Sequence, residues 1–316
     1  MSSGGQALVT GGAGFVGSHV VAGLIGQGTR VRVLDNLSTG QEQNLSDSSV
    51  EFVAGDIRDP EILSGAMQGV RWVFHQAAMV SVPASMDDPL GCYEVNLQGT
   101  LRVLWAAHQA GVQRVVVASS AAVYGEASAP VEEESPKRPL SPYASSKLAM
   151  EQAAQLFTRA YGLPTVCLRY FNAYGPRQRP DSPYAAVIPA FIGAMLEDRP
   201  ATIHGEGDQS RDFVYIGDVV RANLLAAERP EATGGVFNIG SGVSVTILEL
   251  AGFLQELFPQ APAPIHGPSR EGDIRFSKAV MDRAAQALGY RPEVGMLEGL
   301  RSTVEWFRQE RPAPPT

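Results

Sequence analysis

The feature that most restricts the fold of this chain is a glycine-rich turn between an apolar strand and a helix near the N-terminus. Ala7-Leu-Val-Thr forms the strand, Gly11-Gly-Ala-Gly14-Phe-Val-Gly17 follows, a helical pattern continues to Ile25, and Val31–Asp35 is a second strand. The glycines allow a tight turn and close approach to a pyrophosphate, while the helix supplies N–H groups and partial positive charge. The glycines alone fit any tight turn, but their strand–helix–strand context predicts an α/β fold, a doubly wound parallel sheet that binds a dinucleotide.

The residues after the second and third strands predict which dinucleotide binds. Asp35 lies eighteen residues after Gly17, near the ~20 expected of an acid that hydrogen-bonds a ribose 2′-hydroxyl. A carboxylate there repels a 2′-phosphate, which favours NAD over NADP. Asn36 to Gly40 is a polar loop suited to adenosine. Asp56 ends the third strand, where it can accept from the adenine amino group or cap the helix near Pro60.

The segment from Val115 to Lys147 supplies a set of groups for proton transfer. A β-branched run ends in Ser119 and Ser120 and reads as a buried parallel strand. Pro142 suits the first turn of a helix on which Tyr143 and Lys147, four apart, share one face. A neighbouring ammonium is expected to lower the pKa of the phenol. A tyrosine–lysine pair alone is common on helix surfaces, but here the strand, the serines and the nucleotide motif agree with it.

Length and composition narrow the class of protein, its partners and its location. The 316 residues, 44% hydrophobic and 18% charged, fit one large or two smaller soluble domains. The net charge of −8 argues against nucleic acid or an anionic membrane as the main partner. The two cysteines, Cys92 and Cys167, support neither a disulfide framework nor a metal site. The sequence shows no signal peptide and no long apolar span, so we expect a cytoplasmic location.

The order of the elements predicts two interleaved lobes. We expect a nucleotide-binding domain at 1–172 and a substrate lobe at 173–316, with 217–250 rejoining the first domain. His75 is expected to be a satisfied core histidine. A long helix is expected over 93–110, in which Asn96 either holds the end of the 115–120 strand or faces solvent.

The motifs of nearly the whole chain, from about Ala7 to Tyr290, resemble the extended short-chain dehydrogenase/reductases. Those motifs are Thr10 to Gly17, Asp35-Asn36, the two serines before Tyr124-Gly125, Tyr143-x-x-x-Lys147, Arg169-Tyr-Phe-Asn172 and Gln209 to Asp218. Within that superfamily the chain is most similar to UDP-hexose 4-epimerases, and to the UDP-N-acetylglucosamine 4-epimerase branch in particular. The segments that suggest this branch are His75 to Pro83, Tyr184 to Pro189 and Arg270 to Ser277.

The resemblance implies a role for each matching position. Tyr143 would be the base, Lys147 its partner on the nicotinamide ribose, and Ser120 the hydroxyl that bonds the sugar O4. NAD would be held by Gly11, Gly14, Phe15, Val16, Asp35, Asn36, Ser38, Gly40, Asp56, Ile57, Gln76, Ala77, Ala78, Ser119, Tyr143, Lys147 and Tyr170. A UDP-hexose or UDP-N-acetylhexosamine would be held by Ser81, Ser120, Tyr143, Asn172, Ala186, Val187, Thr202, His204, Arg211, Arg270 and Ser277.

Three of these implied positions bear on substrate choice and binding. Ser277 would border the C2 substituent of the sugar, and its small size would admit an N-acetyl group; alternatively it only caps a helix at 278–288. Arg211 and Arg270 would bind the diphosphate, although a surface ion pair is the commoner fate of a single arginine. The resemblance also implies a homodimer through the helices at 93–110 and 143–161.

The resemblance leaves three functions open. The first is NAD-dependent C4 epimerisation of a UDP-hexose. The second is a related reaction on the same scaffold: UDP-glucuronate 4-epimerisation, with Arg177, Arg179 or Arg275 pairing the carboxylate, or a dehydratase or decarboxylase. Lyases of this kind carry acids before the residue matching Tyr124, where this chain has Ala121 and Ala122. The third is an NAD-binding regulator with a vestigial triad, against which the intact Ser120, Tyr143 and Lys147 argue.

Overall fold

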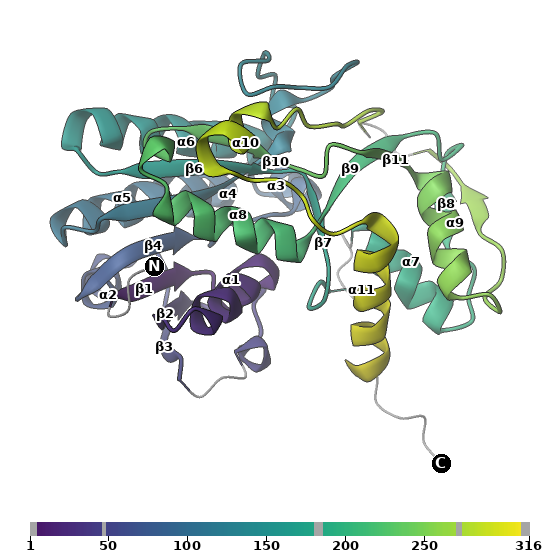
Figure 1. Ribbon diagram of the computed structural model, residues 1–316, viewed down its shortest axis with the longest axis horizontal. Helices are drawn as coiled ribbons and strands as arrows, with labels where there is room; N and C mark the ends of the chain where they lie inside the picture. The colour runs from purple at the N-terminus through teal and green to yellow at the C-terminus, as the bar shows by residue number, and fades with distance from the viewer. Residues whose placement is uncertain (1–4, 46–48, 180–185, 270–273, 311–316) are drawn as a thin grey trace.

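The computed structural model describes residues 5–45, 49–179, 186–269 and 274–310, and its centre is a parallel sheet of seven strands (Figure 1). The strands, in their order across the sheet, are β10 (Val236–Ile239), β6 (Thr165–Tyr170), β5 (Arg114–Ser120), β4 (Val70–His75), β1 (Gln6–Thr10), β2 (Arg30–Asp35) and β3 (Glu51–Ala54). The order reverses between β1 and β4, so a cleft opens where the carboxyl ends of β1 and β4 diverge. The expected doubly wound sheet is confirmed.

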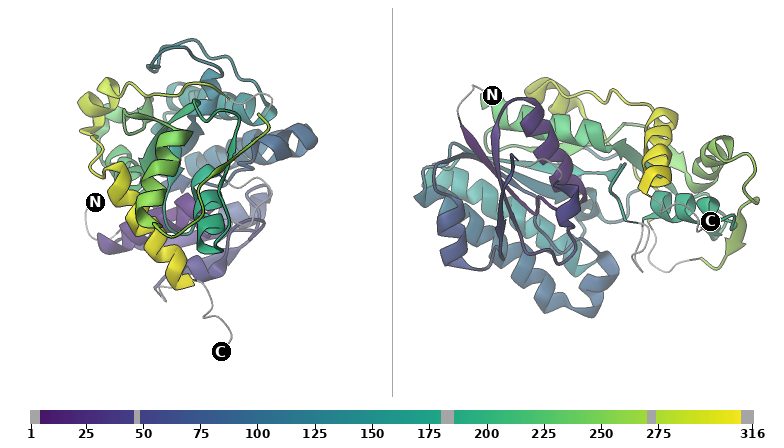
Figure 2. Two further views of the ribbon diagram at one scale, coloured as in Figure 1. Left: turned by 90° about the vertical axis from the view of Figure 1, so that its right-hand side faces the viewer. Right: turned by 90° about the horizontal axis from the view of Figure 1, so that it is seen from below.

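Helices cover both faces of the sheet, which makes three layers (Figure 2). On one face lie α1 (Phe15–Gly26), α8 (Ile216–Glu228) and α10 (Asp282–Leu288). On the other face lie α2 (Pro60–Ala66), α5 (Gly99–Gln109) and α6 (Pro142–Tyr161). Because both faces are covered, the central strands are largely buried; in β5, six of the seven residues are buried.

The glycine-rich turn joins β1 to α1 as the sequence predicts, and the space around it requires glycine. Gly11 has a φ of +70°, and a Cβ there would lie 2.6 Å from the backbone nitrogen of Ala77. A Cβ on Gly17 would lie 2.0 Å from the carbonyl oxygen of Gly11. The turn is therefore packed directly against the start of its own helix and the end of β4.

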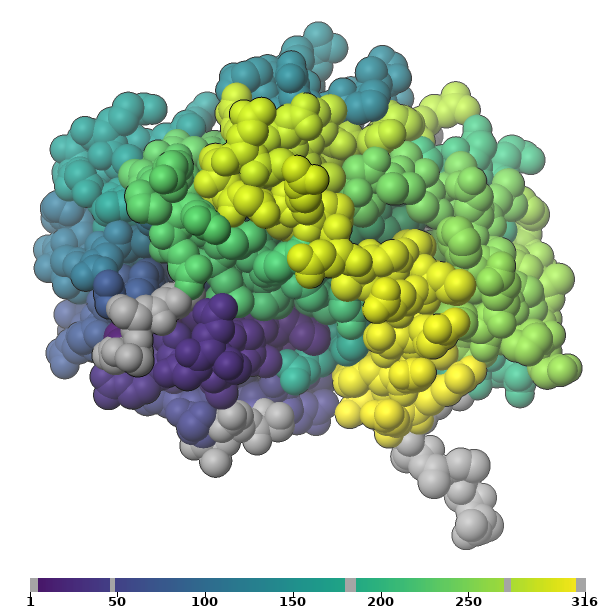
Figure 3. All heavy atoms as spheres, viewed as in Figure 1, coloured from purple at the N-terminus to yellow at the C-terminus, as the bar shows by residue number. Residues whose placement is uncertain are grey.

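A second lobe is built on a small sheet and a separate apolar cluster. Its strands are β7 (Asn172–Tyr174), β9 (Ser210–Tyr215) and β11 (Ser244–Thr246), with the pair β8 (Thr202–His204) and β12 (Ile265–Gly267) beside them. Its helices are α7 (Val187–Leu196), α9 (Ile247–Leu257) and α11 (Met296–Glu310). The C-terminal segment crosses from the first lobe to the second over the front face (Figure 3).

The structure alters three expected boundaries. The segment that returns to the large sheet contains α8 and β10 but ends there, because β11 and α9 pack in the second lobe. The expected helix over 93–110 consists of α4 (Pro89–Tyr93), a π turn at Glu94–Gln98 and α5. The expected helix at 278–288 begins only at Asp282, so Ser277 does not cap it.

Candidate active site

The end of β5 and the first turn of α6 bring the predicted triad together. The Ser141 hydroxyl caps α6 by accepting from the Ala144 N–H at 3.1 Å, and Pro142 occupies the first turn. Ser120 adjoins the phenol of Tyr143 and acts to lower its pKa. A hydroxyl pair of this kind suits proton exchange with a substrate alcohol held against both groups.

Lys147 is buried beneath the tyrosine. Its Nζ donates to the carbonyl oxygen of Ala118 at 2.8 Å and lies 5.8 Å from the centre of the Tyr143 ring. Burial lowers the pKa of Lys147 to about 8. The pKa of Tyr143 is raised by burial, against which Ser120 acts in the lowering direction. The expected lowering of the phenol pKa by the ammonium is therefore wrong for the chain alone, because burial has the largest effect on Tyr143 and raises its pKa.

Asn96 adopts neither of the expected positions. It is fully buried in the π turn and hydrogen-bonds both backbone groups of Met79: its Oδ1 accepts from the N–H at 2.7 Å and its Nδ2 donates to the carbonyl at 3.1 Å. Its Nδ2 also donates to the Ser146 hydroxyl at 2.9 Å, and Ser146 donates to the carbonyl of Tyr143 at 2.8 Å. Asn96 thus ties the segment after β4 to the helix that carries the tyrosine.

The predicted nucleotide site fits NAD in its backbone and its acidic groups. The Asp35 carboxylate accepts from the N–H groups of Ala13 at 2.9 Å and Leu37 at 2.8 Å, which fixes it at the end of β2 beside the glycine turn. A Cβ on Gly14 would meet only the Gly11 carbonyl, at 3.3 Å, so the turn leaves room for a ligand there. Phe15 and Val16 open α1, whose N-terminus carries partial positive charge suited to a pyrophosphate.

The sequence left open whether Asp56 contacts adenine or caps α2, and the structure excludes the cap. Asp59, not Asp56, caps α2 by accepting from Glu61 and Ile62. Asp56 instead pairs with Arg58, whose hydrogen bonds lower the pKa of the carboxyl to about 2. It also accepts from Asn36 at 3.0 Å, so two predicted adenosine contacts adjoin each other.

The end of β6 contributes a polar cluster that the sequence reading found only in part. Tyr170 donates to Asn223 of α8 at 3.0 Å, and Gln76 donates to the same oxygen at 3.1 Å. Burial raises the pKa of the Tyr170 phenol. Asn223 was not among the predicted residues, and its place in an apolar helical pattern was the one available signal. The Ser119 hydroxyl donates to Glu151 and is buried, so it points into the protein.

The predicted substrate residues converge on one pocket of about 210 Å³ in the second lobe. Six of them line it: Asn172, Ala186, Val187, Thr202, His204 and Arg211. The lining also contains residues that the sequence reading missed: Ala173, Tyr174, Gln178, Ile188, Gln209, Phe213 and Ile247. The mixture of a guanidinium, amides and apolar side chains suits an anionic ligand with a planar ring.

Ser120 and Tyr143 belong to the triad, and neither Ser81 nor Ser277 lines this pocket. The Ser81 hydroxyl caps α3 (Val82–Asp87) by accepting from Ala84 at 3.1 Å. Ser277 is partly buried, and its carbonyl accepts from the Ser244 hydroxyl at 3.0 Å. Arg270 lies outside the described residues.

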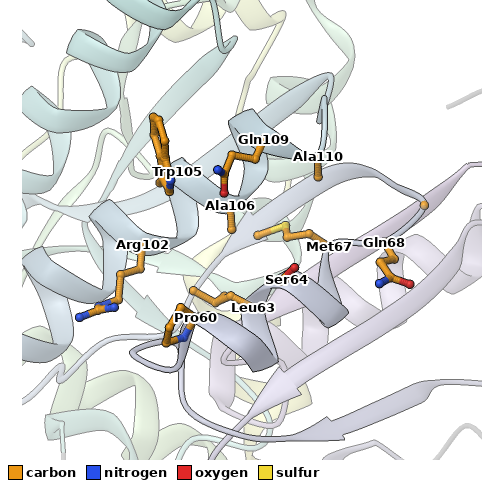
Figure 4. Close-up of a pocket in the computed structure, with 11 residues that line it drawn as sticks. Pro60, Leu63, Ser64, Met67, Gln68, Arg102, Trp105, Ala106, Gln109 and Ala110 are labelled. Atoms are coloured by element: carbon orange, nitrogen blue, oxygen red, sulfur yellow. The ribbon is translucent and has the colours of Figure 1, made fainter.

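A larger pocket, of about 440 Å³, lies between α2 and α5 and is separate from these groups (Figure 4). Leu63 lines it from α2, Met67 from the residue that follows α2, and Arg102 and Trp105 from α5. No predicted site residue lines it.

Two other features, a membrane-spanning helix and a cluster of metal ligands, are absent from the described residues. The helices of those residues lack the length and apolar character needed to cross a membrane. In the same part of the chain, no three His, Cys, Asp or Glu side chains are grouped so that they could hold a metal ion.

Comparison with known proteins places these features in one family. Residues 7–240 match the model of the NAD dependent epimerase/dehydratase family. A UDP-glucose 4-epimerase of Mycolicibacterium smegmatis is 39% identical over 313 residues, covering 96% of this chain and 99% of that protein. The structure of a UDP-N-acetylglucosamine 4-epimerase from Methanobrevibacter ruminantium, in complex with UDP-N-acetylmuramic acid, superposes with a TM-score of 0.94 at 37% identity, covering 98% and 100% of the two chains. A Thermus thermophilus UDP-glucose 4-epimerase in complex with NAD gives 0.88 at 40% identity, covering 97% and 100%.

Proposed function

The chain belongs to the NAD dependent epimerase/dehydratase family, and from that premise we propose that it interconverts UDP-hexoses that differ in configuration at C4. The observation that carries the proposal is the pairing of Ser120 with Tyr143 over a buried Lys147, with a separate polar pocket in the second lobe. The triad suits a secondary alcohol of the sugar, and the pocket in the second lobe suits the nucleotide that anchors the sugar.

The reaction divides between the cofactor and the side chains of the chain. NAD, when bound, would supply the reversible hydride acceptor that oxidation and reduction at C4 of the sugar require. Tyr143 takes the proton from the C4 hydroxyl, and Ser120 holds that oxygen by a hydrogen bond. Lys147 supplies positive charge beneath the phenol, which favours its ionised form. The nucleotide stays in its pocket while the hexose turns, so positioning accounts for much of the rate.

We propose UDP-GlcNAc and UDP-GalNAc as the preferred pair, with UDP-Glc and UDP-Gal as further substrates. The supporting feature is Ser277, whose side chain is small where the family borders the C2 substituent. The pocket lined by Asn172, His204 and Arg211 supports binding of the UDP moiety, in which a guanidinium fork suits the diphosphate.

The alternative reactions receive less support from the residues. Ala121 and Ala122 carry no group that can transfer a proton, which disfavours a dehydratase or decarboxylase. For a UDP-glucuronate 4-epimerase, Arg275 is already paired with Asp208 at 3.0 Å. Arg177 has a buried Nη1 without a hydrogen bond, but it does not line the pocket of the second lobe.

One set of assays separates these functions. Purified protein is incubated with UDP-GlcNAc, UDP-Glc and UDP-GlcA side by side, and products are separated by chromatography after bound NAD has been quantified. We expect C4 epimers of the first two and no loss of water or CO₂. Tight NAD binding without turnover of any UDP-sugar would instead indicate a regulator, and turnover of UDP-GlcA alone would indicate the uronate enzyme.

We also propose a homodimer that forms through α5 and α6 in the cytoplasm. Four large side chains on these helices are exposed: Leu101, Trp105, Leu156 and Tyr161. Trp105 and Tyr161 contact each other edge to face, with ring centres 5.9 Å apart, so the two helices share an exposed aromatic contact. Sedimentation velocity on the wild type and on Trp105→Glu tests this, since the charge should yield monomers.

A further inference from the structure

A buried ion pair lies directly behind the triad and joins α6 to β6. Arg169 of β6 donates from Nε to Oε1 of Glu151 at 2.8 Å and from Nη2 to Oε2 at 2.7 Å. The two side chains are only 4% and 3% exposed. A bidentate guanidinium–carboxylate pair fixes both orientation and distance, and burial makes its partners interdependent.

The pair extends on both sides into a satisfied network. On one side, the Ser119 hydroxyl donates to Oε1 of Glu151. On the other, Arg169 donates from Nη1 to the Tyr124 hydroxyl at 2.8 Å, and Tyr124 donates to Asn238 of β10 at 2.6 Å. Three adjacent strands and α6 are thereby linked through side chains.

Three members of this network, Ser119, Arg169 and Glu151, adjoin residues of the proposed site. Ser119 precedes Ser120 on β5, and Arg169 precedes Tyr170 on β6. Glu151 lies one helical turn after Lys147 on the same face of α6. A shift of the pair would therefore move Ser120, Lys147 and Tyr170 relative to one another.

We propose that Glu151 and Arg169 are a positioning pair for the epimerase, holding the end of β5 against α6 so that Ser120, Tyr143 and Lys147 keep their relative positions, and that the Glu151 carboxylate helps Lys147 stay protonated. The inference rests on the proposed function for its effect on rate. Its electrostatic part, the effect of Glu151 on the protonation of Lys147, does not depend on that function and can be measured in the folded protein without substrate.

The surroundings of Lys147 give Glu151 this second role. Burial is the main influence on the lysine and favours its neutral form. The groups that face it are Cys92 on α4, Cys167 on β6, His75 on β4, Tyr143 and Glu151 on its own helix, and the Ala118 carbonyl of β5. Both cysteines are buried, and burial raises the pKa of each thiol, so they stay neutral. Glu151 is thus the anion among these neighbours, and it opposes the effect of burial.

The lysine can be observed directly, because the chain contains three lysines, Lys137, Lys147 and Lys278. Protein labelled with ¹³C at lysine Cε gives one signal for each, and titration of the Lys147 signal is compared between wild type and Glu151→Gln. We expect the midpoint to move down by about one pH unit, since an opposite charge is lost. Lys278 serves as the internal control. An unchanged Lys147 midpoint would overturn the electrostatic part.

The positioning part is tested by kinetics with a conservative rescue. Glu151→Gln should lower kcat by about 10- to 100-fold with little change in KM, because the reacting groups are misplaced while the nucleotide pocket is intact. Glu151→Asp, which keeps the charge, should recover part of kcat and return the Lys147 midpoint toward the wild-type value. The control is Asp218→Asn, which removes another buried carboxylate, one that pairs with Arg221 at 2.9 Å in α8.

If Glu151→Gln fails to fold, Ser119→Ala is a second variant, and it leaves no buried charge without its partner. It removes only the link between β5 and the carboxylate, and we expect kcat to fall about tenfold at constant KM and constant melting temperature. The positioning role is wrong if Asp218→Asn lowers kcat as much as Glu151→Gln, or if Ser119→Ala is indistinguishable from wild type. A wild-type protein without epimerase activity would count against the proposed function, whereas the lysine titration would still decide the electrostatic part.

Discussion

The Nζ of Lys147 lies 2.8 Å from the carbonyl oxygen of Ala118, two residues before Ser120 on the same strand. The lysine therefore links the helix that carries the proposed base to the strand that carries the proposed hydroxyl. Because its ammonium is buried, its protonation is sensitive to pH in the range where the enzyme would work.

The pH dependence of kcat/KM should reflect this lysine. The pKa of Lys147 is about 8, below its ordinary value, so the ammonium is present at neutral pH and lost as pH rises through 8. We expect kcat/KM for a UDP-sugar to be level near pH 7 and to fall above about pH 8. In Lys147→Arg the guanidinium stays charged, so its residual activity should show no such fall. A level wild-type profile up to pH 10 would contradict this assignment.

Removal of the Tyr143 hydroxyl should abolish most of the activity. Tyr143→Phe leaves the ring beside Lys147 but nothing to take the substrate proton, and we expect kcat to fall by about 10²- to 10⁴-fold. Bound NAD and the melting temperature should stay at wild-type values, which separates a chemical from a structural loss. Near-normal turnover would show that another group is the base.

The glycine turn offers a test of cofactor binding with a matched control. A Cβ at Gly17 would meet the Gly11 carbonyl at 2.0 Å, whereas a Cβ at Gly26, in the same helix, meets nothing within 4 Å. Gly17→Ala should yield protein with little bound NAD, measured after denaturation and extraction. Gly26→Ala should bind NAD as the wild type does. Equal NAD content in the two variants would be the contrary outcome.

Ser277 should control access of the N-acetyl group. Ser277→Tyr adds a large ring to a partly buried position, and we expect kcat/KM for UDP-GlcNAc to fall at least tenfold while that for UDP-Glc changes little. Ser277→Ala, which stays small, should keep both activities. Equal losses for the two sugars in the tyrosine variant would remove Ser277 from the specificity site.

The stability of the protein should decrease in mild acid because of its buried histidines. His75 is held neutral between Thr10 at 2.7 Å and Thr100 at 2.9 Å, and burial lowers its pKa to about 3; the pKa of His19 is lowered to about 4. Below about pH 6.5 the unfolded chain takes up protons that the folded chain does not. Each histidine should then reduce the free energy of unfolding by about 1.4 kcal/mol per pH unit.

Urea unfolding between pH 7 and pH 4.5 measures this effect. Replacing His75 by Asn should lower stability at pH 7, because both threonines lose a partner, and should make the remaining dependence on pH shallower. A free energy of unfolding that is constant over this range in the wild type would contradict the prediction.

Local features of the sequence determined the main outline of the protein. The strand–turn–helix of Gly11 to Gly17, the capped helix after Ser141 and the spacing of Tyr143 and Lys147 are each set within a few residues, so their patterns could be interpreted directly. The parallel sheet also follows from the sequence, because its buried strands are continuous apolar runs separated by helices.

Tertiary structure alone decided which polar side chains meet. Asn223 joins Gln76 from 147 residues away, and Asn96 reaches Ser146 over 50 residues, so no local pattern announces either contact. The same holds for Arg169 and Glu151, which lie 18 residues apart on a strand and a helix. Burial also reversed the expected direction for the pKa of Tyr143, since the loss of hydration depends on everything packed around the phenol and not on its neighbour four residues away.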